Sequence, residues 1–248
     1  MKKIIMLIVL FVAIFVANHF FNNGDKVNQD VGTDDNSAVI DENGETIDGD
    51  VVTVATGTKY LDADISYPKN NPLVKGMVLS EYFSWASDTE ILKMTDRVAG
   101  DIGLREGMAY QYQAEYSVVQ GNNTTSYVYD IYSFTAGAHG SAYKRVYSFD
   151  KDNKQIDIAK TLTQAQLNKI SKIAYNDIKN QMIKNLEVNS ESQADINTEW
   201  LAEGTSPTRK NYSVAWYDGS DLVVYFGQYQ VAPYVFGEFE VHIPLSSL

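Results

Sequence analysis

The 248-residue chain is 44% hydrophobic and 21% charged, which is typical of a globular protein with enough apolar surface for an ample core. It contains no cysteine, and this excludes disulfides, thiolate catalysis, zinc–thiolate sites and a lipoprotein anchor. Its formal net charge of -12 argues against nucleic acid as a partner.

The first 21 residues have the features of a membrane segment. Two lysines precede an uninterrupted apolar run from Ile4 to Ala17, and the sequence stays largely apolar to Phe21. A run of this length fits the core of a signal peptide, whereas a spanning helix needs about 20 residues. Cleavage after Ala17 would place Phe15 where a small residue is required, which favours an uncleaved single-pass anchor over residues 4–21. In either case the rest of the chain is expected outside the cytoplasm, and it would be secreted if the segment were cleaved.

Most of the negative charge lies in the segment that follows. Between Asp25 and Asp50 there are nine acidic residues and one lysine, a sum of -8; with +2 from the first two lysines, -6 remains for residues 51–248. Residues 22–50 have few apolar side chains and no periodicity, so we expect a disordered acidic linker. Residues 41–50 faintly resemble a calcium loop, but their glycine is out of register for an EF-hand.

From about Val51 the sequence shows strand and helix patterns. Alternating apolar residues predict a strand over 58–69, ended by a proline. Apolar residues at helical spacing predict a helix over 77–99, with Gly100 as its stop. Two alternating runs about the Gly-Asn-Asn turn at 121–123 predict a hairpin, and another strand follows; these strands are expected over 108–119, 124–134 and 141–150.

A second helix has a clear start signal. Thr163 followed by Gln166 forms a capping box, and the apolar residues after it are spaced for one helix face. That face comprises Leu167, Ile170, Ala174, Ile178, Met182 and Leu186. Residues 187–210 are expected to be a loop, and strands are expected over 211–217, 222–231 and 238–245. The order of these elements predicts an α+β fold with mainly antiparallel sheets and two packed helices, after an N-terminal membrane helix.

The common catalytic and metal-binding motifs are missing from the sequence. It has no HExxH, GxSxG, P-loop or GxGxxG pattern, and its two S-x-x-K matches, at 66–69 and 141–144, lack their partner motifs. Alternate carboxylates, such as Asp62 with Asp64 or Glu238 with Glu240, are typical of the solvated face of a strand. We therefore expect neither a metal nor a cofactor.

One loop combines small residues with a histidine. The segment FTAGAHG, residues 134–140, contains His139, the only histidine outside the membrane segment and the last strand. Gly137 and Gly140 give the backbone freedom for a sharp corner, in which the imidazole would only cap a carbonyl group. The same open backbone would let a ligand approach, with His139 as a hydrogen-bonding contact. The residues themselves leave both interpretations open.

Aromatic residues crowd the last predicted hairpin and the loop after it. They are Tyr225, Phe226, Tyr229, Tyr234 and Phe236. Alternate members of this set would fill the core as ordinary strand residues. Exposed members would instead form a platform of the kind that holds sugar rings or a protein partner.

Two motifs resemble those of a known family. FTAGAHG is similar to the family's Tyr-Thr-Gly-Gly-Ala-His-Gly, with Phe134 in place of the tyrosine and Ala136 in place of one glycine. The second motif, YxVxPYxxG, occupies residues 229–237. Over about residues 55–248 the chain thus resembles a two-part extracytoplasmic module of unknown function. That module is found in a lysozyme-sensing anti-sigma factor and in the non-catalytic N-terminal part of a peptidoglycan deacetylase.

The resemblance implies a first α+β subdomain over 51–140, similar to the deacetylase part, and a second over 141–248, similar to the C-terminal part of the anti-sigma factor. It implies an anchored module that binds peptidoglycan or a muramidase-like (lysozyme-like) protein, rather than an enzyme. The expected ligand contacts are Thr135, Gly137, His139, Gly140, Tyr229, Tyr234 and Phe236. The alternatives are a small cell-wall hydrolase, in which His139 acts with Asp150 or Asp130, and a structural envelope protein.

Overall fold

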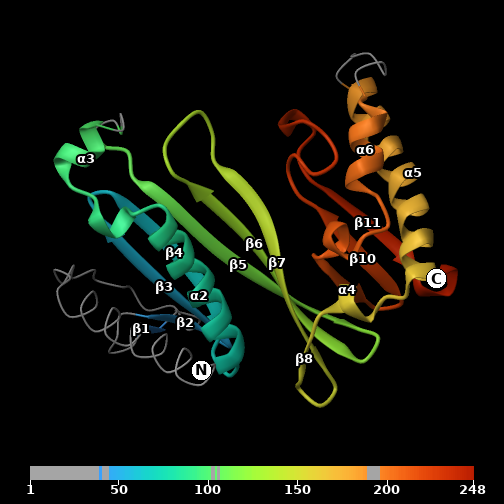
Figure 1. Ribbon diagram of the computed structural model, residues 1–248. Coiled ribbons are helices and arrows are strands. Elements are labelled where there is room, and N and C mark those ends of the chain that lie inside the picture. The colour runs from blue at the N-terminus through green and yellow to red at the C-terminus, as the bar shows by residue number, and fades with distance from the viewer. Residues whose placement is uncertain (1–38, 41–44, 102–103, 105–106, 189–195) are drawn as a thin grey trace, which may run out of the picture.

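The computed structural model describes residues 39–40, 45–101, 104, 107–188 and 196–248. The predicted membrane anchor and most of the predicted linker lie outside these residues. None of the helices in the described part of the chain is long and apolar enough to cross a membrane. The described residues form an α+β fold of two sheets, as predicted, with helices packed against each sheet (Figure 1).

The first sheet has eight strands that lie side by side in chain order. Neighbouring strands are antiparallel, except that β4 and β5 are parallel because the helix α2 (Pro72–Asp88) crosses over between them. The short helices η1 (Ile91–Lys93) and α3 (Asp96–Asp101) complete the crossover. The strands are β1 (Val39–Ile40), β2 (Thr46–Asp48), β3 (Val51–Thr58), β4 (Leu61–Pro68), β5 (Tyr110–Gly121), β6 (Thr124–Phe134), β7 (Ser141–Asp150) and β8 (Gln155–Ile156).

In this half one predicted strand is confirmed, and one predicted helix has different bounds. The strand expected over 58–69 is β4, which forms a hairpin with β3. The helix expected over 77–99 begins earlier, because the Asn71 side chain accepts a hydrogen bond from the Val74 N–H and Pro72 fits the first turn. It also ends earlier, at Asp88, just before Glu90 adopts a left-handed conformation (φ 53°).

The second sheet has three antiparallel strands in the order β11-β10-β9, with the long helix α5 as its main cover. The strands are β9 (Ala215–Asp218), β10 (Asp221–Phe226) and β11 (Phe239–Pro244). The helices are α4 (Ile158–Thr161), α5 (Gln164–Val188), α6 (Thr198–Gly204), η3 (Arg209–Tyr212), η4 (Tyr234–Phe236) and η5 (Leu245–Ser247).

The predicted start of α5 is confirmed. The N–H of Gln166 donates to the Thr163 hydroxyl oxygen (3.3 Å), and the N–H of Thr163 donates to the side-chain oxygen of Gln166 (2.9 Å). The six apolar residues of the predicted helix face are all at most 1% exposed. Their burial shows that this face of α5 packs on the second sheet; we call the apolar cluster between α5 and this sheet the second core.

The sheets divide the chain at a different place from the predicted subdomains. The resemblance places residues 141–150 in the second subdomain, but as β7 they pair with β6 along their whole length. They do so because the short corner at 134–140 returns the chain antiparallel to β6, so the change of sheet falls after Ile156. Thr46–Asp48, expected within the disordered linker, is strand β2, and residues 198–204 of the expected loop are helix α6.

The two sheets meet through a small apolar cluster, which we call the junction. It consists of Val128 from β6 with Trp216, Val223 and Tyr225 from the second sheet, all at most 5% exposed. The turn between β5 and β6 also contacts the second sheet, since the N–H of Gly219 donates to the Gln120 carbonyl (3.0 Å). Successive side chains of a strand point to opposite faces, so α2 and α5 cover the faces turned away from the junction.

The apolar cluster between α2 and the first sheet, which we call the first core, is rich in buried tyrosines. Tyr112 and Tyr129 are fully buried, and the ring of Tyr82 from α2 lies 5.3 Å from that of Tyr112. Burial raises the pKa of Tyr82 to about 12, and burial together with the Glu81 carboxylate raises the pKa of Tyr147 to about 12. The folded protein thus keeps these phenols neutral at pH values where they would ionise in the unfolded chain.

The close approach of the two sheets predicts a large effect of one methyl group at Gly121. A Cβ atom there would lie 2.6 Å from the backbone carbonyl of Tyr217 and 2.8 Å from the backbone nitrogen of Gly219. Because these are backbone atoms, Gly121→Ala must move the β5–β6 turn away from β9. We expect the free energy of unfolding, measured by urea denaturation, to fall by about 1–3 kcal/mol.

Gly57→Ala in β3 is the matched control for this substitution. Its Cβ would make only an ordinary contact, 3.6 Å from the Leu61 carbonyl. An equal loss of stability in the Gly57→Ala and Gly121→Ala proteins would show that the contact of Gly121 with the backbone of β9 is not the cause.

The buried phenols predict a loss of stability at alkaline pH. The pKa of Tyr82 rises from 10.0 to about 12 on folding, so the folded state holds the proton more strongly. The stabilisation is therefore complete below the unfolded value of 10.0 and is lost as the pH rises to about 12. We expect the free energy of unfolding to fall over this range, and to fall less in Tyr82→Phe, which keeps the ring but cannot ionise. Equal falls in the two proteins, measured by urea denaturation, would show that Tyr82 is not responsible.

Candidate functional site

The histidine loop, residues 134–140, is shaped by its backbone. Ala136 and Gly137 adopt positive φ angles of 67° and 102°, which turn the chain sharply between β6 and β7. At Gly140 a Cβ would lie 2.4 Å from the ring of Tyr132, so a side chain there would require that ring to shift. The structural interpretation of this segment as a tight corner is therefore correct as far as its backbone is concerned.

The same corner presents the His139 side chain at the surface. Its Nδ1 donates a hydrogen bond to the Gly140 carbonyl (2.9 Å), and His139 is exposed. With the proton on Nδ1, the neutral imidazole has a free lone pair on Nε2. The ring is thus held in place by its own loop, with one hydrogen-bond acceptor available to a ligand.

The aromatic loop, residues 227–237, is fixed against helix α6. The Trp200 indole N–H donates to the Tyr229 carbonyl (3.2 Å), and the Gln230 side-chain amide donates to the Asn211 carbonyl (2.9 Å). Gly204 allows the approach, because a Cβ there would lie 2.2 Å from the Gln230 carbonyl oxygen. Tyr229 itself adopts a positive φ of 64°, an unusual conformation for a tyrosine.

The two loops meet, and they do so through their aromatic rings. The imidazole of His139 stacks on the ring of Tyr234, with 4.0 Å between centroids and 24° between planes. Tyr234 in turn lies 5.8 Å from Tyr229, which is 51% exposed. We call His139, Tyr234 and Tyr229 the aromatic triad; it joins a loop of the first sheet to a loop of the second.

The remaining predicted contact residues have different places. Thr135 is exposed on the histidine loop, and Gly137 and Gly140 shape that loop rather than offering side chains. Phe236 is half-buried and packs against the second core, so it attaches the aromatic loop to that core. Trp200 also belongs to this group, since its indole N–H holds the Tyr229 carbonyl. The sequence analysis missed it because helix α6 was expected to be a loop. The available signal was Asn197, whose side chain caps the N-terminus of α6.

A shallow hollow of about 380 Å³ adjoins the aromatic triad. It lies between α6, η3 and the aromatic loop, and both Tyr229 and Trp200 contribute to its wall. Its other lining residues are Glu203, Gly204, Lys210, Asn211 and Gln230. The exposed ring of Tyr229 therefore stands beside a depression with charged and amide groups.

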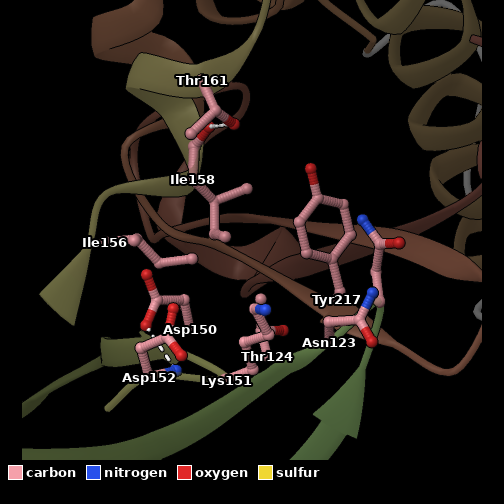
Figure 2. A pocket seen from close by; sticks show the side chains of 10 residues that line it. Asn123, Thr124, Asp150, Lys151, Asp152, Ile156, Ile158, Thr161 and Tyr217 are labelled. Atoms are coloured by element: carbon pink, nitrogen blue, oxygen red, sulfur yellow. Dashed lines mark hydrogen bonds between the residues drawn. The ribbon is translucent and has the colours of Figure 1, made fainter. Parts of the chain in front are cut away.

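A second hollow of about 380 Å³ lies beside the turn between β5 and β6 (Figure 2). Asn123, Asp150, Ile158 and Tyr217 are among its lining residues. The Asp150 carboxylate caps its own turn, accepting the N–H groups of Asp152 (2.9 Å) and Lys154 (3.0 Å). The strand β6 separates this hollow from the histidine loop by about 33 Å, at roughly 3.3 Å per residue. It contains no residue of the two motifs.

Neither of the carboxylates expected to act with His139 is paired with it. Asp150 lies at the far end of β6 and caps a turn, while Asp130 pairs with Lys144. Within the described residues His139 forms no ion pair with a carboxylate, and no cluster there could hold a metal ion. The triad offers a ligand aromatic ring faces and one imidazole nitrogen.

The fold and the triad define a class of protein: an α+β module of two sheets with an exposed aromatic site between two loops. Residues 157–246 match the family model described as "Protein of unknown function (DUF3298)". The match begins directly after β8 and contains the whole second sheet and the aromatic loop, but not the histidine loop.

A curated protein is similar to part of the chain. The chain is 28% identical over 142 residues to the peptidoglycan-N-acetylmuramic acid deacetylase PdaC of Bacillus subtilis (strain 168). This match covers 56% of the chain and only 28% of the deacetylase. The resemblance to a peptidoglycan deacetylase, expected from the two motifs, is confirmed.

Two crystal structures share the fold. A DUF3298 family protein from Pseudomonas aeruginosa PAO1 aligns with a TM-score of 0.54 at 18% identity, over 80% of this chain and 91% of that protein. A DUF3298 family member from Bacteroides fragilis aligns with a TM-score of 0.51 at 16% identity, over 79% and 90%. These alignments extend beyond residues 157–246, so both sheets belong to the shared fold.

The contact between α6 and the aromatic loop predicts the effect of a methyl group at Gly204. Alanine is the better helix former, so propensity alone predicts stabilisation by up to about 1 kcal/mol. The backbone clash with Gln230 predicts the opposite: destabilisation by about 1–3 kcal/mol and a displaced aromatic loop. Urea denaturation measures the first effect, and fluorescence of Trp200, which is bonded to that loop, reports the second.

Gly76→Ala is the control for Gly204→Ala. Gly76 also lies in a helix, α2, but a Cβ there would meet nothing within 4 Å. Gly76→Ala is therefore expected to be neutral or stabilising. If Gly204→Ala were stabilising as well, the backbone contact between Gly204 and Gln230 could not be as close as described.

Proposed function

We propose that the protein is a membrane-anchored, extracytoplasmic module that binds the glycan of peptidoglycan through the aromatic triad. The observation that carries this proposal is the stack of His139 on Tyr234 beside the exposed ring of Tyr229. Sugar rings have an apolar face of C–H groups and a rim of hydroxyls. Aromatic faces accept the first, and the free Nε2 of His139 would accept a hydrogen bond from the second.

The rigidity of the triad supports a binding role. His139 is held by the Gly140 carbonyl, and the Tyr229 backbone by Trp200, so neither loop has to be ordered when a ligand arrives. Binding to side chains that are already in place avoids much of the entropic cost of association. Val235, 79% exposed between Tyr234 and Phe236, would add apolar contact area at the edge of the same surface.

The similarity to a peptidoglycan deacetylase supports the choice of ligand. The match covers little more than a quarter of that enzyme. The apolar run over residues 4–21, with lysines before it, supports an anchor that would place the module next to the cell wall.

Sedimentation with insoluble peptidoglycan tests the proposal. The detergent-solubilised full chain is expected to co-sediment, and His139→Ala and Tyr234→Ala are each expected to weaken binding about 5- to 10-fold, as for the loss of one aromatic contact of about 1–1.4 kcal/mol. Both variants should stay folded, because His139 is exposed and Tyr234 lies outside the two cores.

Leu73→Ala provides a matched control for these variants. Leu73 is 50% exposed on α2, on the far side of the first sheet, and its truncation should leave sedimentation unchanged. No sedimentation of the wild-type chain, or equal sedimentation of the wild type and both triad variants, would contradict the proposal.

A further inference from the structure

The hollow beside the aromatic triad carries two charges of opposite sign that the fold does not use. Glu203 on α6 and Lys210 on η3 both line it, and both residues are exposed. In the part of the chain that the structure describes, neither forms an ion pair with the other or with a third residue. The hollow therefore presents one carboxylate and one ammonium group to a ligand.

The uncharged polar groups of the wall are already occupied by the backbone. The side-chain amides of Asn211 and Gln230 each donate to two backbone carbonyls, at distances between 2.9 and 3.4 Å. The Trp200 indole N–H donates to the Tyr229 carbonyl (3.2 Å). Because these N–H donors are used within the protein, they are not available to the hydroxyl groups of a further sugar.

The two charges are carried by backbone segments that are tied together. The side-chain amide of Asn211, the residue after Lys210, donates to the carbonyl of Glu203 (2.9 Å). Helix α6, which carries Glu203, is itself capped at its N-terminus by Asn197. A ligand that contacts both charges would therefore meet a wall whose backbone is already in place, and this lowers the entropic cost of binding.

The hollow is continuous with the aromatic triad. Tyr229 belongs to both, since its ring lies 5.8 Å from that of Tyr234 and it also lines the hollow. The volume of about 380 Å³ is at the lower end of the range of small-ligand pockets, which is roughly 300–1,000 Å³. A ligand that is bound on the triad can thus extend a small branch into the hollow.

We infer that the hollow binds the peptide of peptidoglycan, so that the protein recognises glycan that carries peptides rather than bare glycan. This inference rests on the proposed function and specifies its ligand. The peptides branch from the glycan strand and end in a carboxylate, and those that are not cross-linked also carry a free side-chain amine. Lys210 would pair with the carboxylate and Glu203 with the ammonium group.

The opposite signs of the two charges disfavour other occupants of the hollow. A neutral sugar unit would leave both charges without a partner. A polymer with charges of one sign would be repelled by Glu203 or by Lys210. A peptide with one carboxylate and one ammonium group offers a partner to each of them.

The test compares two soluble fragments that have the same sugars. The full chain in micelles is titrated with a tetrasaccharide of alternating N-acetylglucosamine and N-acetylmuramic acid, either bare or with a tetrapeptide on each muramic acid. Each tetrapeptide has a free carboxylate and a free side-chain amine, both of which are charged at about pH 7. We expect the peptide-bearing fragment to bind about 5- to 10-fold more tightly, as for two exposed ion pairs.

Substitution of the two charged residues should remove this preference. The double variant Glu203→Gln with Lys210→Gln is expected to reduce it to less than about twofold and to bind the bare fragment as the wild type does. Acetylation of the peptide amine should weaken binding to the wild type about 2- to 3-fold. It should not change binding to Glu203→Gln, in which the partner of the amine is already missing.

Glu199→Gln with Lys172→Gln is the matched control, because it also removes one charge of each sign. Glu199 lies on the same helix as Glu203 and Lys172 on α5; both are exposed and neither lines the hollow. The control should keep the preference. All four substituted residues are exposed, so both double variants should stay folded, which urea denaturation checks.

The outcomes separate this inference from the proposed function. Equal binding of the two fragments by the wild type would overturn the inference and leave the proposed function intact. A preference that survives in Glu203→Gln with Lys210→Gln, or that is lost equally in the control, would show that the hollow is not its cause and would overturn the inference too. Binding of neither fragment would also overturn it, and if the full chain then fails to sediment with peptidoglycan, the proposed function is overturned as well.

Discussion

The contact between the two sheets is the constraint on which the rest of the structure depends. Val128 on one side and Trp216 and Val223 on the other exclude water from a narrow strip, and the backbones approach so closely at Gly121 that only glycine fits. Each sheet has its larger core on its outer face, under α2 or α5, and the junction is the buried cluster in which strands β6, β9 and β10 of the two sheets meet. It therefore determines how the loops at the end of the sheets face each other.

The candidate site follows from this constraint. His139 comes from the first sheet and Tyr234 from the second, and neither loop contains the aromatic triad by itself. The DUF3298 match covers the part with Tyr229 and Tyr234, while the histidine loop lies before it. A site of this kind requires both sheets in one chain. The Lys144 ion pairs add a polar link between the sheets next to the apolar one.

The sequence predicted the local features well and the long-range contacts poorly. The capping box of Thr163 and the hairpin of β5 and β6 depend on neighbouring residues, and both were found at the expected places. Which sheet a strand belongs to depends on the strands it pairs with. The alternation of residues 141–150 predicts a strand, but it does not indicate that this strand pairs with β6 of the first sheet. Both motifs of the site were recognised, but the stack of His139 on a residue 95 positions away (234 - 139) has no signal in periodicity. Helix α6 was missed because it is too short, at seven residues, to show a periodic pattern.

The central claim is that the two loops form one glycan-binding surface, and NMR chemical-shift mapping tests it most directly. Soluble peptidoglycan fragments would be titrated into the isotope-labelled full chain in micelles. The account predicts that signals of residues 134–140 and of residues 229–237 shift together, with the same concentration dependence, and that the turn at Asn122 and Asn123 stays unchanged. Shifts confined to one of the two loops, or to the hollow at that distant turn, would contradict it.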